Sequence, residues 1–338
     1  MKAAIIGLGR MGLRHVAVAR GLGLDVVGAA DPRAEARAAA KSQFDLPDGA
    51  MFEDAEAMLA GTRPDCVVVA STAPSHARLT CAAVEAGARL ILCEKPMAVS
   101  LDDCDRMIDR CRDAGVRLAV NHQMRFMDQY IRPRAIVDAP SFGGLASMTV
   151  VAGNFGLAMN GSHYVEAFRF MTGEAPRTVA AWLSSEAVPN PRGAEFSDAG
   201  GCLRLTTASG RRFYLEAGTD QGHGMMAVYA GRYGRLEVDE LSGRMRLATR
   251  APQDRDLPTT RYGTAPLLEE SDIPPADALE PTRAVLQALL AGENHPDGEV
   301  GRMAVRVLLA AAVSHEAGGR EIDLDSADLP GSRVFAWA

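Results

Sequence analysis

Lysine is so rare in this chain that each one calls for a chemical explanation. Of the 36 basic residues, only Lys2, Lys41 and Lys95 are lysines, and the remainder are arginines. Lys95 lies between Glu94 and Pro96, directly after an apolar run typical of a buried strand. A lysine can bind a substrate hydroxyl and exchange a proton with it, whereas an arginine stays protonated. Lys95 is therefore predicted to be catalytic; the alternative is a surface ion pair with Glu94.

A glycine-rich run near the N-terminus has the pattern of a dinucleotide-binding loop. Residues 7–12 read G-L-G-R-M-G, between a strand-like stretch and a helical one. The first glycine permits a tight turn, the second admits a pyrophosphate, and the third lets the helix pack closely on the strand. The free N–H groups at the start of the helix would bind the phosphate charge. The residues of this loop predicted to contact a cofactor are Gly7, Gly9, Arg10, Met11 and Gly12.

Asp31 and Arg33, which follow the next strand-like stretch, indicate which dinucleotide binds. Asp31 follows Gly12 by 19 residues, where a carboxylate can accept hydrogen bonds from an adenosine ribose. Because a carboxylate repels a 2′-phosphate, NAD is the predicted cofactor and NADP the less favoured one. Arg33 leaves NADP open, since it could either stack on adenine or pair with a phosphate. The alternative for Asp31 is a cap of the following helix.

The pattern of elements predicts how these residues are positioned. Over the first ~120 residues, short apolar runs alternate with helical stretches, which predicts a parallel sheet covered on both faces. Residues 1–121 are therefore expected to form a doubly wound, Rossmann-type α/β domain. Its expected strands are 3–6, 25–30, 65–70, 89–93 and 116–121, and its expected helices are 11–21, 33–43, 76–86 and 101–114.

After residue 121 the pattern changes to strands in series. Residues 122–338 are predicted to form an α+β domain with a large mixed or antiparallel sheet. Residues 251–275 are expected to be irregular, and two closing helices, at 279–291 and 300–317, are free to pack back on the first domain. The other expected helices are 126–137 and 162–172, and the other expected strands are 178–188, 202–207, 211–217, 225–230, 235–238 and 245–248.

Composition excludes several classes of protein. A net charge of −7 argues against nucleic acid as the partner, and no apolar run is long enough to cross a membrane. The N-terminal segment does not have the pattern of a signal peptide. The six cysteines form no C-x-x-C pair and are expected to be buried thiols in a reducing, cytoplasmic compartment. No metal site is predicted, because His15, His223, His295 and His315 have no partners at metal-ligand spacing and are interpreted as surface or packing residues.

Taken together, these motifs resemble the Gfo/Idh/MocA oxidoreductases, over essentially the whole chain. That resemblance implies a nicotinamide-dependent oxidation or reduction at a carbon of a sugar or cyclitol. It also implies that the second domain supplies the substrate wall and that its open sheet face forms a homo-oligomer contact. The resemblance is carried by residues 7–12, Asp31, Ser75-His76, Glu94-Lys95-Pro96, residues 121–126 (NHQMRF), Gly161-Ser162-His163, residues 196–205 (FSDAGGCLRL), Ser209-Gly210 and residues 297–302 (DGEVGR).

The resemblance also implies roles for single residues. His163 matches the family's catalytic histidine, but the aspartate common one turn earlier is Met159 here, so Asn160 is the neighbouring group that could offer an amide to the substrate. The alternative for His163 is a histidine at a helix start that the backbone satisfies. Thr72, His76, Glu94 and Lys95 are expected beside the cofactor, with a plain helix-start residue as the alternative for His76. Asn121 and Arg125 are expected to contact substrate, with a structural ion pair as the alternative for Arg125.

The function predicted from these residues is hydride transfer to or from a sugar-like substrate. The segment MNGSHYVEAFRFMTGE, residues 159–174, resembles members that act in cell-surface polysaccharide pathways, so a nucleotide-activated sugar is one candidate substrate. Two alternatives stay open: an NAD-retaining, redox-neutral enzyme similar to certain glycosidases, and a non-catalytic NAD-binding regulator.

Overall fold

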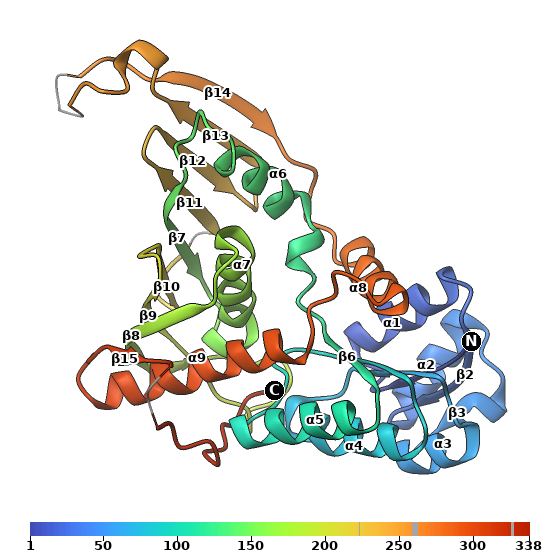
Figure 1. The fold of residues 1–338 in the computed structure, drawn as a ribbon. Helices are drawn as coiled ribbons and strands as arrows, with labels where there is room; N and C mark the ends of the chain where they lie inside the picture. The colour runs from blue at the N-terminus through green and yellow to red at the C-terminus, as the bar shows by residue number, and fades with distance from the viewer. Residues whose placement is uncertain (223, 259–262, 326–327) are drawn as a thin grey trace.

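The chain folds around two sheets that share a helical interface (Figure 1). The computed structural model describes residues 1–222, 224–258, 263–325 and 328–338. The first sheet has six strands and lies in the N-terminal part, and the second has nine strands and lies in the C-terminal part. The predicted combination of a doubly wound α/β part and a large mixed sheet is confirmed.

The first sheet is parallel throughout, in the order β3-β2-β1-β4-β5-β6. Its central strands are buried along almost their whole length, as expected of continuous apolar runs covered by helices on both faces. The strands are β1 (Lys2–Ile6), β2 (Asp25–Ala30), β3 (Met51–Phe52), β4 (Cys66–Val69), β5 (Leu90–Cys93) and β6 (Arg117–Val120).

Five helices connect these strands. The sequence pattern did not predict β3, which has two residues, or the short helix α3 beside it. α5 begins as expected, with the Ser100 side chain accepting a hydrogen bond from the Asp103 backbone N–H at 3.2 Å. The helices are α1 (Arg10–Gly21), α2 (Ala34–Phe44), α3 (Ala55–Thr62), α4 (His76–Glu85) and α5 (Leu101–Asp113).

The second sheet has the order β14-β13-β12-β11-β7-β10-β9-β8-β15, and its pairs are antiparallel except for β7 with β10. The six predicted strands correspond to β8 through β13, whereas β7, β14 and β15 were not predicted. The strands are β7 (Leu145–Gly153), β8 (Pro176–Val188), β9 (Asp198–Thr207), β10 (Arg212–Gly218), β11 (Met226–Gly231), β12 (Gly234–Asp239), β13 (Arg244–Thr249), β14 (Leu267–Asp272) and β15 (Ile322–Asp323).

The expectation that residues 251–275 are irregular is wrong for part of the segment. Strand β14 lies inside it and pairs with β13 along six residues. All six residues of β14 are exposed, so the strand has no buried face and shows no alternation of polar and apolar residues. An exposed edge strand with acidic residues therefore carries no hydrophobic signal that a sequence pattern could detect.

Four helices of the C-terminal part lie between the sheets or beside them (Figure 1). α6 (Asp128–Val137), α7 (Ser162–Thr172) and α9 (Gly298–Glu316) pack on one face of the nine-stranded sheet. α8 (Leu279–Ala291) instead packs on α1, and its Val285, Leu286 and Leu289 join the core of the first sheet. The closing helices therefore return to the first part of the chain, and the division into residues 1–121 and 122–338 stays a prediction.

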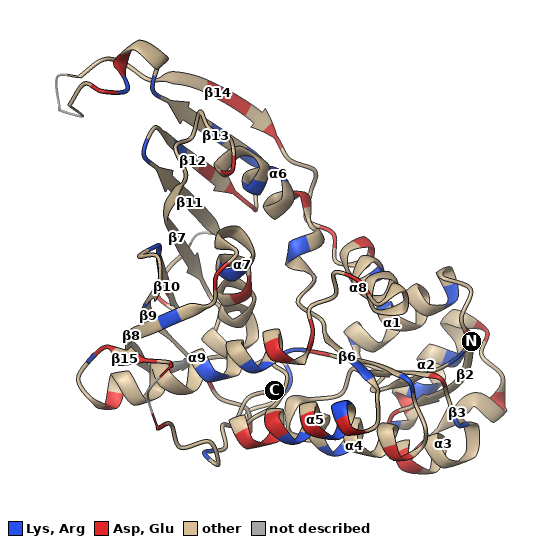
Figure 2. Cartoon of the chain, in the orientation of Figure 1, with Lys and Arg blue, Asp and Glu red and all other residues tan. Residues whose placement is uncertain are grey.

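The charged residues and the cysteines are placed as the composition predicts. Acidic and basic positions are interspersed along the outer helices α3, α4 and α5 (Figure 2). The six cysteines are free thiols, each buried or half-buried. The described residues hold no helix that is long and apolar enough to cross a membrane.

Candidate active site

The loop between β1 and α1 leaves room for a phosphate. Gly7 has a φ of +89°, and a Cβ added to Gly12 would lie 1.8 Å from the Gly7 carbonyl oxygen, so neither position tolerates a side chain. A Cβ added to Gly9 would meet nothing within 4 Å. α1 begins at Arg10 with no side-chain cap, so its first N–H groups are available to an anion. The loop fits a dinucleotide pyrophosphate.

Asp31 lies at the end of β2, beside this loop, and is almost fully buried. Its carboxylate accepts hydrogen bonds from the Leu8 backbone N–H at 2.8 Å and from the Arg33 backbone N–H at 2.9 Å. The Arg33 guanidinium also binds it, at 3.1 Å from each carboxylate oxygen. Burial opposes the charge, but these donors outweigh it and lower the pKa of Asp31. Arg33 therefore covers the carboxylate that is predicted to bind a ribose.

Glu94 follows β5 and is held by three donors. His15 Nε2 and Asn121 Nδ2 each donate to Glu94 Oε1 at 2.8 Å, and the Lys95 backbone N–H donates to Oε2 at 3.3 Å. Burial alone would raise the pKa of Glu94, yet the His15 hydrogen bond and nearby positive charge lower it to about 2. Glu94 is therefore a fixed negative charge at the carboxyl end of the sheet.

His15 corrects one expectation. Its side chain is wholly buried on α1 and binds Glu94, so it is not a surface residue. It links the helix of the glycine loop to the strand end that carries Lys95, across 79 positions of sequence. The pairing depends on the fold, and no local pattern indicated it. His223, which shared that expectation, lies outside the described residues.

Lys95 is half-buried and points toward the second part of the chain. Its Nζ donates a hydrogen bond to the Met159 carbonyl oxygen. Burial, together with the charges of Arg192 and Arg10, lowers the pKa of Lys95 to about 8, although Glu94 and Asp198 oppose the shift. An amine with this pKa can exchange a proton near neutral pH. Arg192, in the β8–β9 connection, was not singled out by sequence pattern.

Asp198 is a second residue whose role the sequence pattern did not reveal. It lies at the start of β9 and accepts hydrogen bonds from the backbone N–H groups of Ala158 and Met159, at 2.8 and 2.7 Å. These residues belong to a wide turn, Leu157–Gly161, that runs into α7. Gly156 has no room for a side chain, because an added Cβ would lie 2.2 Å from the Asp198 carboxylate. Asp198 thus positions the carbonyl that Lys95 binds.

His163 lies in the first turn of α7, near Lys95, and is 8% exposed. Its Nδ1 has no partner among the described residues, and its ring meets the His122 ring edge-on, with 5.5 Å between centroids. Burial, and then the charge of Lys95, lower the pKa of His163 well below its usual value. Burial lowers the pKa of His122 to about 3. Both rings are therefore neutral near pH 7.

The two predicted substrate residues after β6 are less accessible than expected. Asn121 is fully buried, and its amide donates to Glu94. Arg125 forms an ion pair with Glu166, which lies one turn after His163 on α7. That ion pair is the alternative considered for Arg125 from sequence. Substrate contact by Asn121 or Arg125 stays a prediction.

The remaining predicted residues surround the same region. His76, the first residue of α4, lies between two carbonyl oxygens, with Nδ1 3.0 Å from Pro96 O and Nε2 3.1 Å from Ser71 O. It therefore connects the turn after β4 to the segment after Lys95. Thr72 and Asn160 are half-buried, in the turns before α4 and α7, and Arg10 and Met11 occupy the first turn of α1. Their predicted contacts with cofactor or substrate stay predictions.

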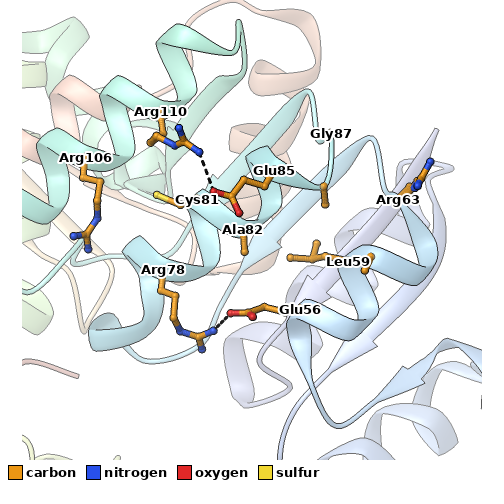
Figure 3. Close-up of a pocket in the computed structure, with 12 residues that line it drawn as sticks. Glu56, Leu59, Arg63, Arg78, Cys81, Ala82, Glu85, Gly87, Arg106 and Arg110 are labelled. Carbon is orange, nitrogen blue, oxygen red and sulfur yellow. Dashed lines mark hydrogen bonds and ion pairs between the residues drawn. The ribbon is translucent and has the colours of Figure 1, made fainter.

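A separate surface groove of about 920 Å³ lies between α3, α4 and α5 (Figure 3). Two ion pairs border it, Arg78 with Glu56 and Arg110 with Glu85. None of the residues considered above lines this groove. Although this groove is large, none of the candidate site residues lines it, so it is not the candidate active site.

Comparison with known proteins gives the following similarities. A family model described as "Oxidoreductase family, NAD-binding Rossmann fold" (GFO_IDH_MocA) matches residues 1–122. D-Apiose dehydrogenase from Paraburkholderia graminis is 32% identical over 198 residues, which cover 53% of this chain and 52% of that protein. The chain thus spans about half the length of this curated relative.

Two solved structures share the fold over nearly the whole chain. An oxidoreductase from Agrobacterium radiobacter, in complex with NAD+, L-tartaric acid and magnesium, has a TM-score of 0.80 and 20% identity, covering 96% of this chain and 99% of that one. The WlbA dehydrogenase from Bordetella pertussis, in complex with NADH and UDP-GlcNAcA, has a TM-score of 0.72 and 20% identity, covering 95% and 98%. At these identities the similarity concerns the fold.

Proposed function

We propose that this chain, whose residues 1–122 match the NAD-binding Rossmann fold of the Gfo/Idh/MocA oxidoreductase family, belongs to that family and is a nicotinamide-dependent dehydrogenase or reductase of a sugar-like alcohol. The observation that carries the proposal is the position of Lys95. It lies at the carboxyl end of β5, its pKa is about 8, and the charge of Arg10 at the start of α1 acts on it. A proton-exchanging amine therefore lies beside the dinucleotide loop.

The residues present fit NAD. The backbone N–H groups at the start of α1 would bind the pyrophosphate over the open space at Gly9. Asp31 would bind the adenosine ribose after Arg33 leaves its carboxylate, and it disfavours the 2′-phosphate of NADP. When bound, NAD supplies the site that accepts or returns a hydride.

Lys95 is assigned the proton transfer that accompanies the hydride. When the substrate is an alcohol, the neutral Lys95 amine would take the hydroxyl proton as the carbon loses its hydrogen as a hydride, which bound NAD would accept. In the reduction, the ammonium form returns that proton to the carbonyl oxygen. Lys95 can approach the substrate by releasing the Met159 carbonyl, to which Nζ now donates. Such positioned acid–base help contributes typically ~10²–10⁴-fold to rate.

His163 then acts as a neutral group. With its pKa well below the usual value, the ring is a weak base, but it can still form one hydrogen bond to the substrate oxygen and keep water away from it. No carboxylate occupies position 159 to hold the ring in its protonated form. The proton transfer falls to Lys95 for this reason.

A nucleotide-activated sugar is the finer proposal for the substrate. The WlbA neighbour binds UDP-GlcNAcA, which supports this class, while the D-apiose dehydrogenase relative supports a simple sugar. The first test is absorbance at 340 nm with NAD+ and a panel of sugars, polyols and nucleotide sugars. Substrate-dependent formation of NADH supports the proposal. Conversion of a substrate without net NADH would favour the redox-neutral alternative, and absence of any conversion would favour the regulator.

The outer face of the nine-stranded sheet is the proposed contact for a homo-oligomer. Trp182 on β8 is 53% exposed and Met226 on β11 is 39% exposed, and both point away from the covered face. Cross-strand pairing places Cys202, Glu216 and Val151 between them in one row. Sedimentation of the wild type and of Trp182→Glu tests the proposal; a wild type that is monomeric at micromolar concentration contradicts it.

A further inference from the structure

A small cavity lies at the far end of α7 from His163 and is lined by three arginines. Its volume is about 230 Å³, below the ~300–1,000 Å³ of sites that hold drug-sized ligands. No carboxylate lines it. Figure 2 marks basic positions on α6 and α7, beside acidic ones. The lining residues are Arg125, Phe126, Arg134, Arg169, Phe170, Gly173 and Asn294.

The positive charge around this cavity exceeds the negative charge that faces it. Arg125, whose side chain is 10% exposed, is paired with Glu166. Arg134 is paired with Asp138 at 3.6 Å, and the Asp138 side chain is largely exposed to solvent. Within the described part of the chain, the Arg169 side chain makes no hydrogen bond or ion pair, and its Nε is buried without a partner. The buried Glu166 carboxylate, already paired with Arg125, is the negative charge that also acts on Arg169. Three guanidinium groups therefore face two carboxylates, one of which is largely exposed to solvent.

The arginines are also held in place. The Phe170 ring lies under the Arg134 guanidinium, 4.4 Å from its centre, and 6.0 Å from that of Arg125. The buried Nε of Arg125 has no partner among the described residues either. A guanidinium that is stacked in this way loses little further freedom when it binds an oxyanion.

We propose that this cavity binds a phosphate group. Planar guanidinium groups donate paired hydrogen bonds to phosphate oxygens, and an ion with two negative charges would offset the positive charge of Arg134 and Arg169. Arg169 lies six residues after His163, which is about 9 Å along the helix, so the phosphate would lie apart from the reacting carbon. The phosphate is either free inorganic phosphate or a group carried on a sugar.

The test uses the whole protein saturated with NADH, so that the dinucleotide loop is already filled. Inorganic phosphate is titrated by calorimetry into the wild type, Arg134→Gln and Arg169→Gln. We expect each substitution to weaken binding at least tenfold. Arg132→Gln is the matched control on α6, because Arg132 donates to the Asp272 carbonyl and does not line the cavity; its affinity should stay within twofold.

Two further titrations distinguish the sources of phosphate. Glucose 1-phosphate that binds more tightly than inorganic phosphate, with the advantage lost in Arg134→Gln, indicates a phosphate carried on a sugar. Equal binding of the two indicates free phosphate. Absence of phosphate binding to the wild type at millimolar concentration, or equal affinity of all variants, overturns the proposal. These outcomes do not depend on turnover, so the proposal can fail while the dehydrogenase assignment stands.

Discussion

Glu94 and Glu166 are two buried carboxylates close to the candidate active site, and the fold stabilises them very differently. Glu94 accepts hydrogen bonds from His15, Asn121 and the Lys95 backbone, and its pKa falls to about 2. Glu166 has one partner, Arg125, and its other oxygen is buried without one among the described residues. Burial outweighs Arg125 and raises the pKa of Glu166.

The surroundings of Glu94 and of Glu166 differ in a way that suggests different roles for the two regions. Around Glu94, three donors fix the carboxylate, although His15 Nδ1 and Asn121 Oδ1 are themselves buried without a partner among the described residues. Along α7, His163, Glu166 and Arg169 follow at intervals of three residues, and each has a buried polar atom without a partner. Such atoms call for water or ligand. We infer that the Glu94 region positions the chemistry and that the α7 face receives ligands.

Glu94→Gln should have the largest effect on stability. With a pKa of about 2 instead of 4.5, the carboxylate stabilises the fold by about 3 kcal/mol at neutral pH. Because the folded-state pKa is lowered, this contribution is complete above pH 4.5 and is lost as the pH falls toward 2. Urea unfolding between pH 3 and 8 should show that the wild type has a higher free energy of unfolding than Glu94→Gln, and that this difference becomes smaller below pH 4.5. A difference in the free energy of unfolding that does not change with pH would mean that the negative charge of Glu94 does not stabilise the fold.

Glu166→Gln is the matched comparison, with the opposite sign. Because the folded-state pKa of Glu166 is raised, ionisation costs the wild type stability as the pH rises above 4.5. The variant does not ionise at this position, so its stability relative to the wild type should increase over that range. A relative stability that decreases with pH would show that both carboxylates are stabilised alike.

Asp198→Asn tests whether a third carboxylate positions the site. An amide can accept from Ala158 or Met159 but presents an N–H₂ group to the other backbone N–H. The carbonyl bound by Lys95 would move, and kcat should fall about tenfold, or about 1.4 kcal/mol, with a smaller change in KM. Asp239→Asn is the control, since Asp239 accepts from two backbone N–H groups in the distant β12–β13 turn. Equal effects of the two would make Asp198 merely structural.

Met159→Asp adds a carboxylate one turn before His163. An opposite charge within ~4–6 Å raises the pKa of a base, so the pH–rate profile should move up by about one unit. Met159→Asn separates charge from shape and should leave the profile in place. His163→Ala measures the histidine directly and should reduce turnover substantially. Full activity of His163→Ala would leave His163 as a helix-start residue.

Asp31→Ser should have the smallest effect, on the choice of cofactor. NAD is expected to bind the wild type more tightly than NADP, and removing the carboxylate should narrow the gap several-fold by removing repulsion of the 2′-phosphate. Calorimetry with both cofactors measures this, with Asp25→Ser, at the other end of β2, as the control. A wild-type preference for NADP would mean that Arg33 dominates.

Local pattern was sufficient to predict that the glycine loop, Asp31 and Lys95 lie at the carboxyl ends of strands of the first sheet. The glycine loop, Asp31 and Lys95 each follow a buried parallel strand, and the carboxyl ends of such strands meet at one edge of the sheet. Their convergence therefore follows from the strand pattern alone.

Contacts across the fold were not predictable in the same way. His15 meets Glu94 and Asp198 meets the turn before α7 only after both sheets have formed. An exposed strand such as β14 has no buried face to mark it. The unpaired groups on α7 can be recognised only when their neighbours are known, because a helical His-x-x-Glu-x-x-Arg pattern alone does not distinguish a satisfied face from an unsatisfied one.

The measurement that tests the account most directly is the pH dependence of NADH formation by the wild type and Lys95→Met. Alcohol oxidation needs the neutral amine, so the wild-type rate should rise with pH and level off above about 8. In Lys95→Met, turnover should fall ~10²-fold or more, and the rise of the rate toward pH 8 should disappear. The melting temperature of this variant should stay within a few degrees of the wild-type value. Lys41→Met, which removes a surface lysine paired with Asp48, should behave as the wild type. A Lys95→Met enzyme that keeps near-normal turnover, or the same step near pH 8, would contradict the assignment of proton transfer to Lys95.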